Sequence, residues 1–106
     1  MQGIAPHYAK GVMERVAEWR GLPADVCHVS SPVYPIGTPV YVYGLNTGVL
    51  RGCIVSDVSQ PGHVARHIAK GYWAELGNNE ARSICGKSAM RDPPRSCPIL
   101  VIRVNE

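Results

Sequence analysis

The chain of 106 residues contains no phenylalanine, and it has no apolar run of about 18 residues that could cross a membrane as a helix. Its first residues, 1–10, lack the apolar core of a signal peptide. At this length we expect a single domain that spans residues 1–106. With 45% hydrophobic residues, 11 glycines and 9 prolines, the composition excludes a disordered segment and disfavours a helical bundle. Many short strands are expected instead.

A strong charge of one sign is also missing. The formal net charge is +3, and lysine and arginine are spread along the chain. The only local concentration comprises Arg82, Lys87, Arg91 and Arg95. Because Asp92 and two prolines interrupt this group, it is typical of a solvated loop. The sequence therefore predicts neither a nucleic-acid partner nor a membrane span.

Closely spaced cysteine pairs of the kind that bind zinc are absent. The cysteines are separated by 26, 32 and 12 positions, at Cys27, Cys53, Cys85 and Cys97. His63 and His67 have a metal-like spacing but no cysteine pair beside them, so neither a metal nor another cofactor is expected.

An even number of cysteines in a small, loop-rich chain favours disulfides. Three pairings are open, and we favour Cys27 with Cys53 and Cys85 with Cys97, because each closes a local loop. Disulfides would place the protein in an oxidising compartment, secreted to the extracellular space or the periplasm. The alternative is a cytosolic domain with four reduced, buried thiols.

Hydrophobic periodicity predicts a mainly β chain with one or two short helices. Strands are expected at 3–9, 38–43, 49–57, 72–76 and 99–104, and helices at 12–19 and 80–85. Residues 25–31 are mixed and polar, and 63–70 is ambiguous between helix and strand. Since 49–57 is apolar on both faces, it is typical of a small closed barrel or a sandwich.

Several short motifs follow one another in a recognisable order. Small and aromatic residues at 5–9 come first, then Gly37-Thr38 before a valine-rich strand, then Thr47-Gly48 in a turn. A strand ending in Asp57, an arginine-containing segment at 66–68, a small helix and a valine-rich last strand complete the series. This order resembles the double-psi β-barrel family that includes rare lipoprotein A, barwin and the expansin N-terminal domain. The resemblance covers nearly the whole chain and implies a mainly β, six-stranded double-psi β-barrel, cross-linked by disulfides.

The resemblance also implies a site, which is incomplete here. Asp57 stands at the family's aspartate, but residues 58–62 replace the Arg-Gly-Pro that follows it. A gapless match puts Ser31 at the family's histidine, so His28 takes that role only with a short insertion. The family's later Ile-Asp-Leu-Ser is matched to residues 68–71, which lack the acid.

Asp57 is the candidate acid/base for cleaving a glycosidic bond, if burial keeps it protonated. Hydrolysis ordinarily needs a second carboxylate, for which the candidates are Glu75, Asp25 and Asp92. A lytic transglycosylase can use one acid/base, because the substrate's own muramic acid hydroxyl closes on the anomeric carbon. His28 or His63 would then orient Asp57. The alternative is that Asp57 merely ends a strand and caps the turn after it.

Aromatic side chains could stack on sugar rings, although most should lie in the core because the chain has no phenylalanine. Trp19 is expected on the apolar face of its helix. Tyr72 and Trp73, on opposite faces of one predicted strand, are the candidates for a half-exposed pair. With His63 and Arg66 they form the predicted substrate-binding set.

Three functions are compatible with these features. The first is a secreted, non-catalytic module that binds peptidoglycan, another extracellular polysaccharide or a protein partner. The second is a peptidoglycan lytic transglycosylase that uses Asp57. The third is a self-assembling subunit of an extracellular or virion structure, in which tyrosines line the contacts. The incomplete site favours the first.

Overall fold

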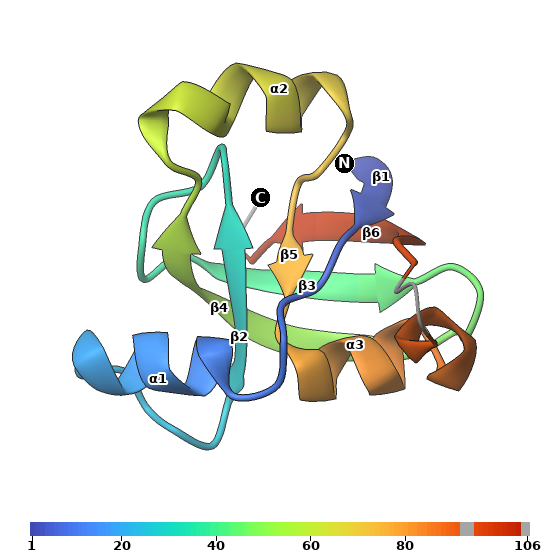
Figure 1. Cartoon of the computed structure of the whole chain (residues 1–106), viewed down its shortest axis with the longest axis horizontal. Coiled ribbons are helices and arrows are strands. Elements are labelled where there is room, and N and C mark those ends of the chain that lie inside the picture. The colour runs from blue at the N-terminus through green and yellow to red at the C-terminus, as the bar shows by residue number, and fades with distance from the viewer. Residues whose placement is uncertain (92–94, 105–106) are drawn as a thin grey trace.

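The computed structural model describes residues 1–91 and 95–104, and Figure 1 shows their arrangement. Six strands form one sheet: β1 (Gln2–Ala5), β2 (Cys27–Ser31), β3 (Pro39–Gly44), β4 (Leu50–Val58), β5 (Glu75–Leu76) and β6 (Cys97–Arg103). The α-helices are α1 (Val12–Trp19), α2 (Val64–Ala69) and α3 (Asn78–Ile84). Two short 3₁₀ helices cover Pro61–His63 and Lys87–Met90. The expected fold class, a mainly β, six-stranded barrel with disulfides, is confirmed, with three short α-helices where one or two were expected.

The sheet curves round into a nearly closed barrel. Its strand order is β1-β6-β3-β4-β2-β5, so β1 and β5 are the two edges. Directly after β1, His7 forms a parallel bridge with Leu76 of β5, which brings the edges together. The backbone N–H of Tyr8 also donates to the Leu76 carbonyl oxygen, at 2.9 Å. Strand β2 runs parallel to β4, and every other strand pair is antiparallel.

The barrel interior is aliphatic. Along β3 the side chains alternate, so that Val40 and Val42 are fully buried while Tyr41 is exposed. None of the tyrosines or tryptophans belongs to the fully buried core of the described residues, which corrects the expectation that most of them would. The inward positions of so small a barrel fill with branched aliphatic side chains, and rings do not fit there. Trp19 is 77% exposed, because Met13 and Ala17 form the buried face of α1 instead.

The structure assigns two segments that the sequence leaves open, and it shortens one predicted strand. Residues 27–31, which the sequence shows only as mixed and polar, form β2, and all five are buried. Such a strand shows no alternation of polar and apolar residues, because both of its faces are covered. The ambiguous segment 63–70 contains α2, and the strand expected at 72–76 is only Glu75–Leu76.

Two disulfides cross-link the barrel, and both predicted pairings are confirmed. Cys27 and Cys53 are directly opposite each other on β2 and β4, with 4.4 Å between their Cα atoms. Cys85, at the end of α3, is bonded to Cys97, at the start of β6. None of the helices in the described part of the chain is long and apolar enough to cross a membrane.

Candidate functional site

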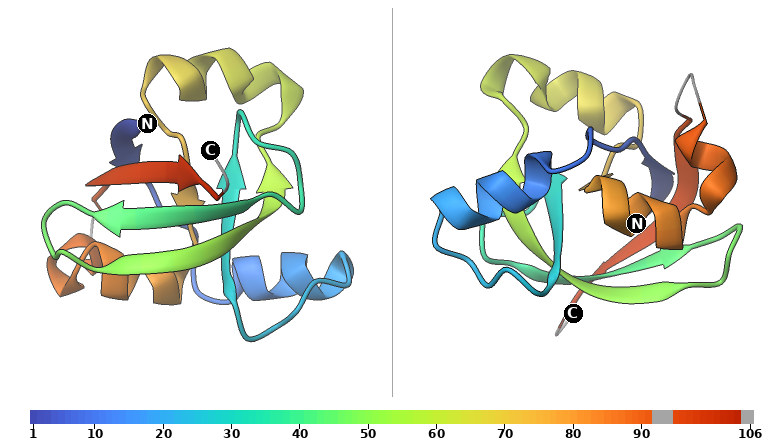
Figure 2. Two further views of the ribbon diagram at one scale, coloured as in Figure 1. Left: turned by 180° about the vertical axis from the view of Figure 1, so that it is seen from behind. Right: turned by 60° about the horizontal axis from the view of Figure 1, so that its bottom comes forward.

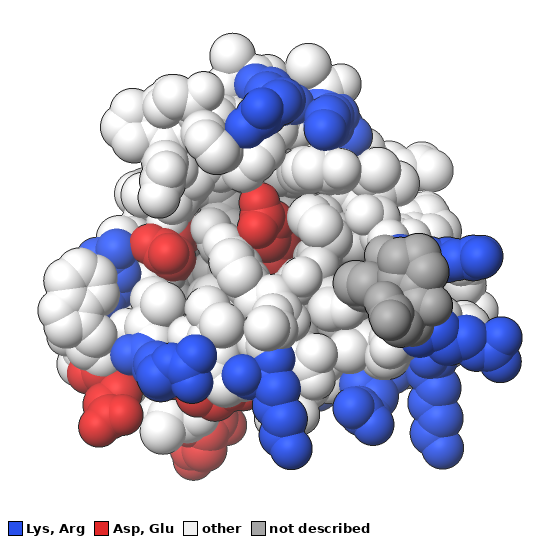
Figure 3. Space-filling model, in the orientation of Figure 1, with Lys and Arg blue, Asp and Glu red and all other residues white. Residues whose placement is uncertain are grey.

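A polar cavity of about 360 Å³ lies at the end of β4, next to α2. Four segments supply its walls: the segment after β1, the end of β4, the helical residues 61–69 and β5. The lining side chains are Tyr8, Asp57, Val58, Ser59, Gln60, His63, His67 and Glu75. Figure 3 shows acidic side chains in a hollow of this face, with basic side chains above them.

The 3₁₀ helix Pro61–His63 and α2 together bring two histidines to this cavity. His63 and His67 are four residues apart and therefore lie on the same side of the helical segment. Their rings make an edge-to-face contact, with 5.7 Å between centroids. Because α2 has no buried residue, it covers this end of the barrel without entering the core.

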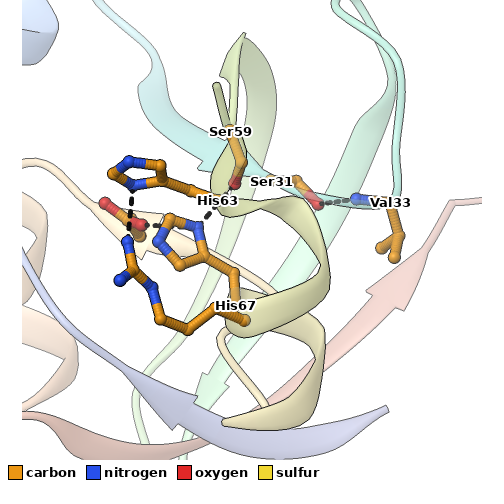
Figure 4. A network of polar contacts seen from close by, with 7 residues as sticks. Ser31, Val33, Ser59, His63 and His67 are labelled. Carbon is orange, nitrogen blue, oxygen red and sulfur yellow. Dashed lines mark hydrogen bonds and ion pairs between the residues drawn. The ribbon is translucent and has the colours of Figure 1, made fainter. Parts of the chain in front are cut away.

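His67 contacts both Ser59, the residue after β4, and Glu75 of β5; Figure 4 shows its ring beside Ser59. Its Nδ1 lies 2.8 Å from the hydroxyl oxygen of Ser59 and 3.4 Å from Oε1 of Glu75. Both partners are therefore on the same ring nitrogen. In a serine-protease triad the hydroxyl and the carboxylate contact opposite nitrogens, so this network is not a nucleophile-activating triad.

Tyr8 faces the same group of residues. Burial raises the pKa of Tyr8 to about 12; the Ser30 hydroxyl opposes the rise, and the carboxylates of Glu75 and Asp57 add to it. The phenol consequently keeps its proton at neutral pH. The cavity thus holds a phenol that interacts with two carboxylates.

The predicted acid/base, Asp57, does line the cavity. Its Oδ1 accepts a hydrogen bond of 2.8 Å from the guanidinium of Arg20, which follows α1. Both side chains are partly exposed. The Arg20 guanidinium also lies 4.8 Å from the centre of the Trp19 ring. Sequence reasoning did not find Arg20, because nothing in the helical pattern indicates that it reaches β4.

His28 does not line this cavity. Its side chain is buried, with Nδ1 2.5 Å from the Ser56 hydroxyl and Nε2 2.7 Å from the carbonyl oxygen of Pro23. Both ring nitrogens are therefore engaged inside the fold, where they hold the segment between α1 and β2 against β4. Of the two histidines proposed to orient Asp57, the one that shares its cavity is His63.

The predicted substrate-binding residues separate into two groups. Arg66 lies within hydrogen-bonding distance of His63 at the surface, with 3.0 Å between Nη2 and Nδ1. Tyr72 contacts the His67 ring from outside the cavity lining, at 5.7 Å between centroids. Trp73 packs against the core and donates from Nε1 to the Gln2 carbonyl oxygen. His63 and Arg66 therefore lie together, and Trp73 belongs to another part of the molecule.

The second carboxylate of the cavity is Glu75. Residues 68–71, which the resemblance matched to the family's acidic motif, lie at the end of α2 and after it. The strand that leads into α3 is β5, and it carries Glu75. Of the other candidates, Asp25 is exposed and outside the cavity lining, and Asp92 falls outside the described residues.

No protein-family model and no curated protein matches the chain. The resemblance to the double-psi β-barrel family therefore stays a prediction from the sequence motifs. Within residues 1–91 and 95–104, no group of three or more His, Cys, Asp or Glu side chains is arranged to hold a metal ion. The chemistry that the cavity offers is proton transfer, from two carboxylates, two imidazoles and a protonated phenol.

Proposed function

We propose that the protein cleaves glycosidic bonds of a peptidoglycan-type polysaccharide outside the cytoplasm. The observation that carries this proposal is that Asp57 and Glu75, from different strands, line one cavity together with Tyr8. A pair of carboxylates beside the scissile bond is the usual equipment for cleaving glycosides. The two disulfides support an oxidising compartment.

The two carboxylates take different roles because their neighbours differ. Asp57 is paired with Arg20 and contributes negative charge beside the oxocarbenium-like transition state. Glu75 has Tyr8 and His67 as neighbours and is the acid/base. His67, whose Nδ1 is 3.4 Å from Oε1, positions the Glu75 carboxyl group.

In the transglycosylase reaction, the Glu75 carboxyl group gives a proton to the glycosidic oxygen as the bond to the anomeric carbon breaks. The muramic acid 6-hydroxyl then attacks that carbon and returns its proton to Glu75. The sugar is left with an intramolecular anhydro bond, and no water is consumed. One residue thus serves first as acid and then as base.

A second candidate function is polysaccharide binding without cleavage. It is favoured by the ion pair between Asp57 and Arg20, which occupies one carboxylate before any ligand enters. In this case the cavity would bind sugar hydroxyls through the same polar groups, and no bond would break.

The test follows purified peptidoglycan in two ways: release of soluble muropeptides, with their anhydro ends measured by mass spectrometry, and pelleting of the protein. We expect Glu75→Gln to lower the release about 100-fold or more, and Asp57→Asn to lower it less. Glu18→Gln, at an exposed position on α1, is the matched control and should release as the wild type does.

Release that persists in Glu75→Gln would refute the assignment of the acid/base. Pelleting of the wild type without release would instead support the binding function. Thermal unfolding of each variant, followed by circular dichroism, separates lost chemistry from lost structure.

A further inference from the structure

The outward side chains of β3, β4 and β6 form a surface without charge. We call it the outer face, and it consists of Pro39, Tyr41, Tyr43, Leu50, Gly52, Ile54, Leu100 and Ile102. The strand register makes it continuous, because Tyr41 lies between Gly52 and Ile102, and Tyr43 between Leu50 and Leu100. Seen from behind, in the left view of Figure 2, these strands lie in front, and none of the helices drawn crosses them.

This composition is unusual for the solvent side of an antiparallel sheet. The residues that face solvent in such a sheet are normally polar. Here they are apolar or aromatic: Leu50 is 58% exposed, and Tyr41 and Ile102 are each 44% exposed. An uncharged, apolar group of side chains on a surface marks a contact site more often than isolated exposed residues do. The outer face is thus a second candidate site, built by other residues than the cavity.

Its centre is a tyrosine that lies over a glycine. Gly52 is the cross-strand neighbour of Tyr41, and a Cβ atom added to Gly52 would lie 3.9 Å from Cε1 of that ring. The ring therefore rests on the bare backbone of β4, and its other side faces solvent. Leu50 and Ile102 flank it and make the surrounding surface apolar.

The size of the outer face argues against a protein partner. Three strands about 4.8 Å apart and five residues long, at about 3.3 Å per residue, cover roughly 250 Å². A stable interface between two proteins needs about 800 Å² from each partner. The outer face supplies about a third of that area, which suits a narrow ligand.

We infer that the outer face binds a neutral stretch of a polysaccharide strand, with a sugar ring stacked on Tyr41. A pyranose ring has an apolar C–H face and hydroxyl groups at its edge, so it matches an exposed aromatic ring on an uncharged surface. The inference rests on the proposed function, and it adds a binding site that would hold the insoluble substrate while another part of it enters the cavity.

The test uses Glu75→Gln as the background, so that the polysaccharide remains intact. Binding to insoluble peptidoglycan, with insoluble chitin and cellulose in parallel, is measured by pelleting over a range of polysaccharide concentrations. We expect Tyr41→Ala to raise the apparent Kd about tenfold and Tyr41→Phe, which keeps the ring, to change it less than about twofold. Ile36→Ala, at a similarly exposed hydrophobic residue outside both the outer face and the cavity lining, is the control and should bind as the background does.

The inference would be overturned if Tyr41→Ala bound as tightly as its background, or if the background bound none of the three polysaccharides. Light scattering of the wild type at high concentration adds a third check. A dimer that Tyr41→Ala dissociates would show that the outer face joins two copies of the chain.

The two proposals fail separately. If muropeptide release depends on Glu75 but binding does not depend on Tyr41, only the proposal of an outer-face site is refuted. If binding depends on Tyr41 but the wild type releases no muropeptides, only the catalytic proposal is refuted.

Discussion

The cavity and the outer face are both open to solvent, yet the barrel builds them in opposite ways. The cavity joins four segments that are distant in sequence, and its polar groups contact one another across them. The outer face comes from three neighbouring strands whose side chains alternate between the core and solvent. The cavity therefore depends on the closure of the barrel, whereas the outer face depends only on the pairing of neighbouring strands.

The largest effect is expected from the disulfide that joins β2 to β4. The Cys27–Cys53 bond fixes the parallel pairing of β2 and β4, and Asp57 follows on the same strand. Replacing both cysteines by alanine should lower the free energy of unfolding by about 3.5 kcal/mol, from the loop-closure entropy of the 26-residue separation. Urea denaturation measures this loss.

The Cys85–Cys97 pair is the control for that variant. It closes a separation of 12 residues, and its replacement should cost about 2.8 kcal/mol. A loss below about 1 kcal/mol for the first pair would show that β2 and β4 hold their register without the bond, which would weaken the contrast between the two sites.

Gly44 on β3 and Gly52 on β4 allow the packing on the inner side of the sheet to be compared with the packing on its outer side. A Cβ atom on Gly44 would lie 2.1 Å from the Ile84 carbonyl oxygen of α3, whereas one on Gly52 meets only Tyr41. Gly44→Ala should therefore destabilise the fold by about 3 kcal/mol, and Gly52→Ala should change it by less than about 0.5 kcal/mol. Thermal and urea unfolding of the two variants check this difference. Equal effects would contradict the assignment of Gly52 to an open surface.

The smallest effect concerns the pH dependence of stability. The pKa of Tyr8 is raised to about 12 in the fold from an ordinary value of 10.0, so folding favours the protonated phenol. This contribution is complete below pH 10 and is lost as the pH rises toward 12, because the unfolded chain releases the proton first. The unfolding free energy of the wild type should fall across this range.

Tyr8→Phe removes the titrating group and is compared with the wild type over the same range. We expect the difference in stability between the two proteins to shrink from pH 9 to pH 11. A constant difference would mean that Tyr8 is not buried among the carboxylates of the cavity.

Much of the fold could be predicted because its signals are local. The alternation of valine and tyrosine indicated β3, the apolar spacing indicated α1 with its observed bounds, and the local loops indicated both disulfides. Strand β2 was missed, since a strand covered on both faces shows no alternation. Helix α3 also begins earlier than the expected residue 80, at Asn78, with Gly77 directly before its first turn.

The site was predicted less completely. Asp57 and His63 were found, and both line the cavity. Glu75 was one of three possible second carboxylates, and no local pattern distinguished it from the others. Tyr8 and Arg20 gave no signal, because their roles arise from contacts with β4 and β5 that only the folded chain makes.

The amino-acid sequence by itself determined which segments become strands of alternating character and which cysteines close local loops. It also determined that the tyrosines and valines of β3 lie on opposite faces of that strand. These features depend on neighbours within a few residues, where backbone geometry and side-chain periodicity act directly. Only the tertiary structure decided that Glu75 joins Asp57 in one cavity, that His28 is used inside the fold, and that the outer face stays uncovered. Such placements depend on how the strands close into a barrel, which brings together residues that are far apart along the chain.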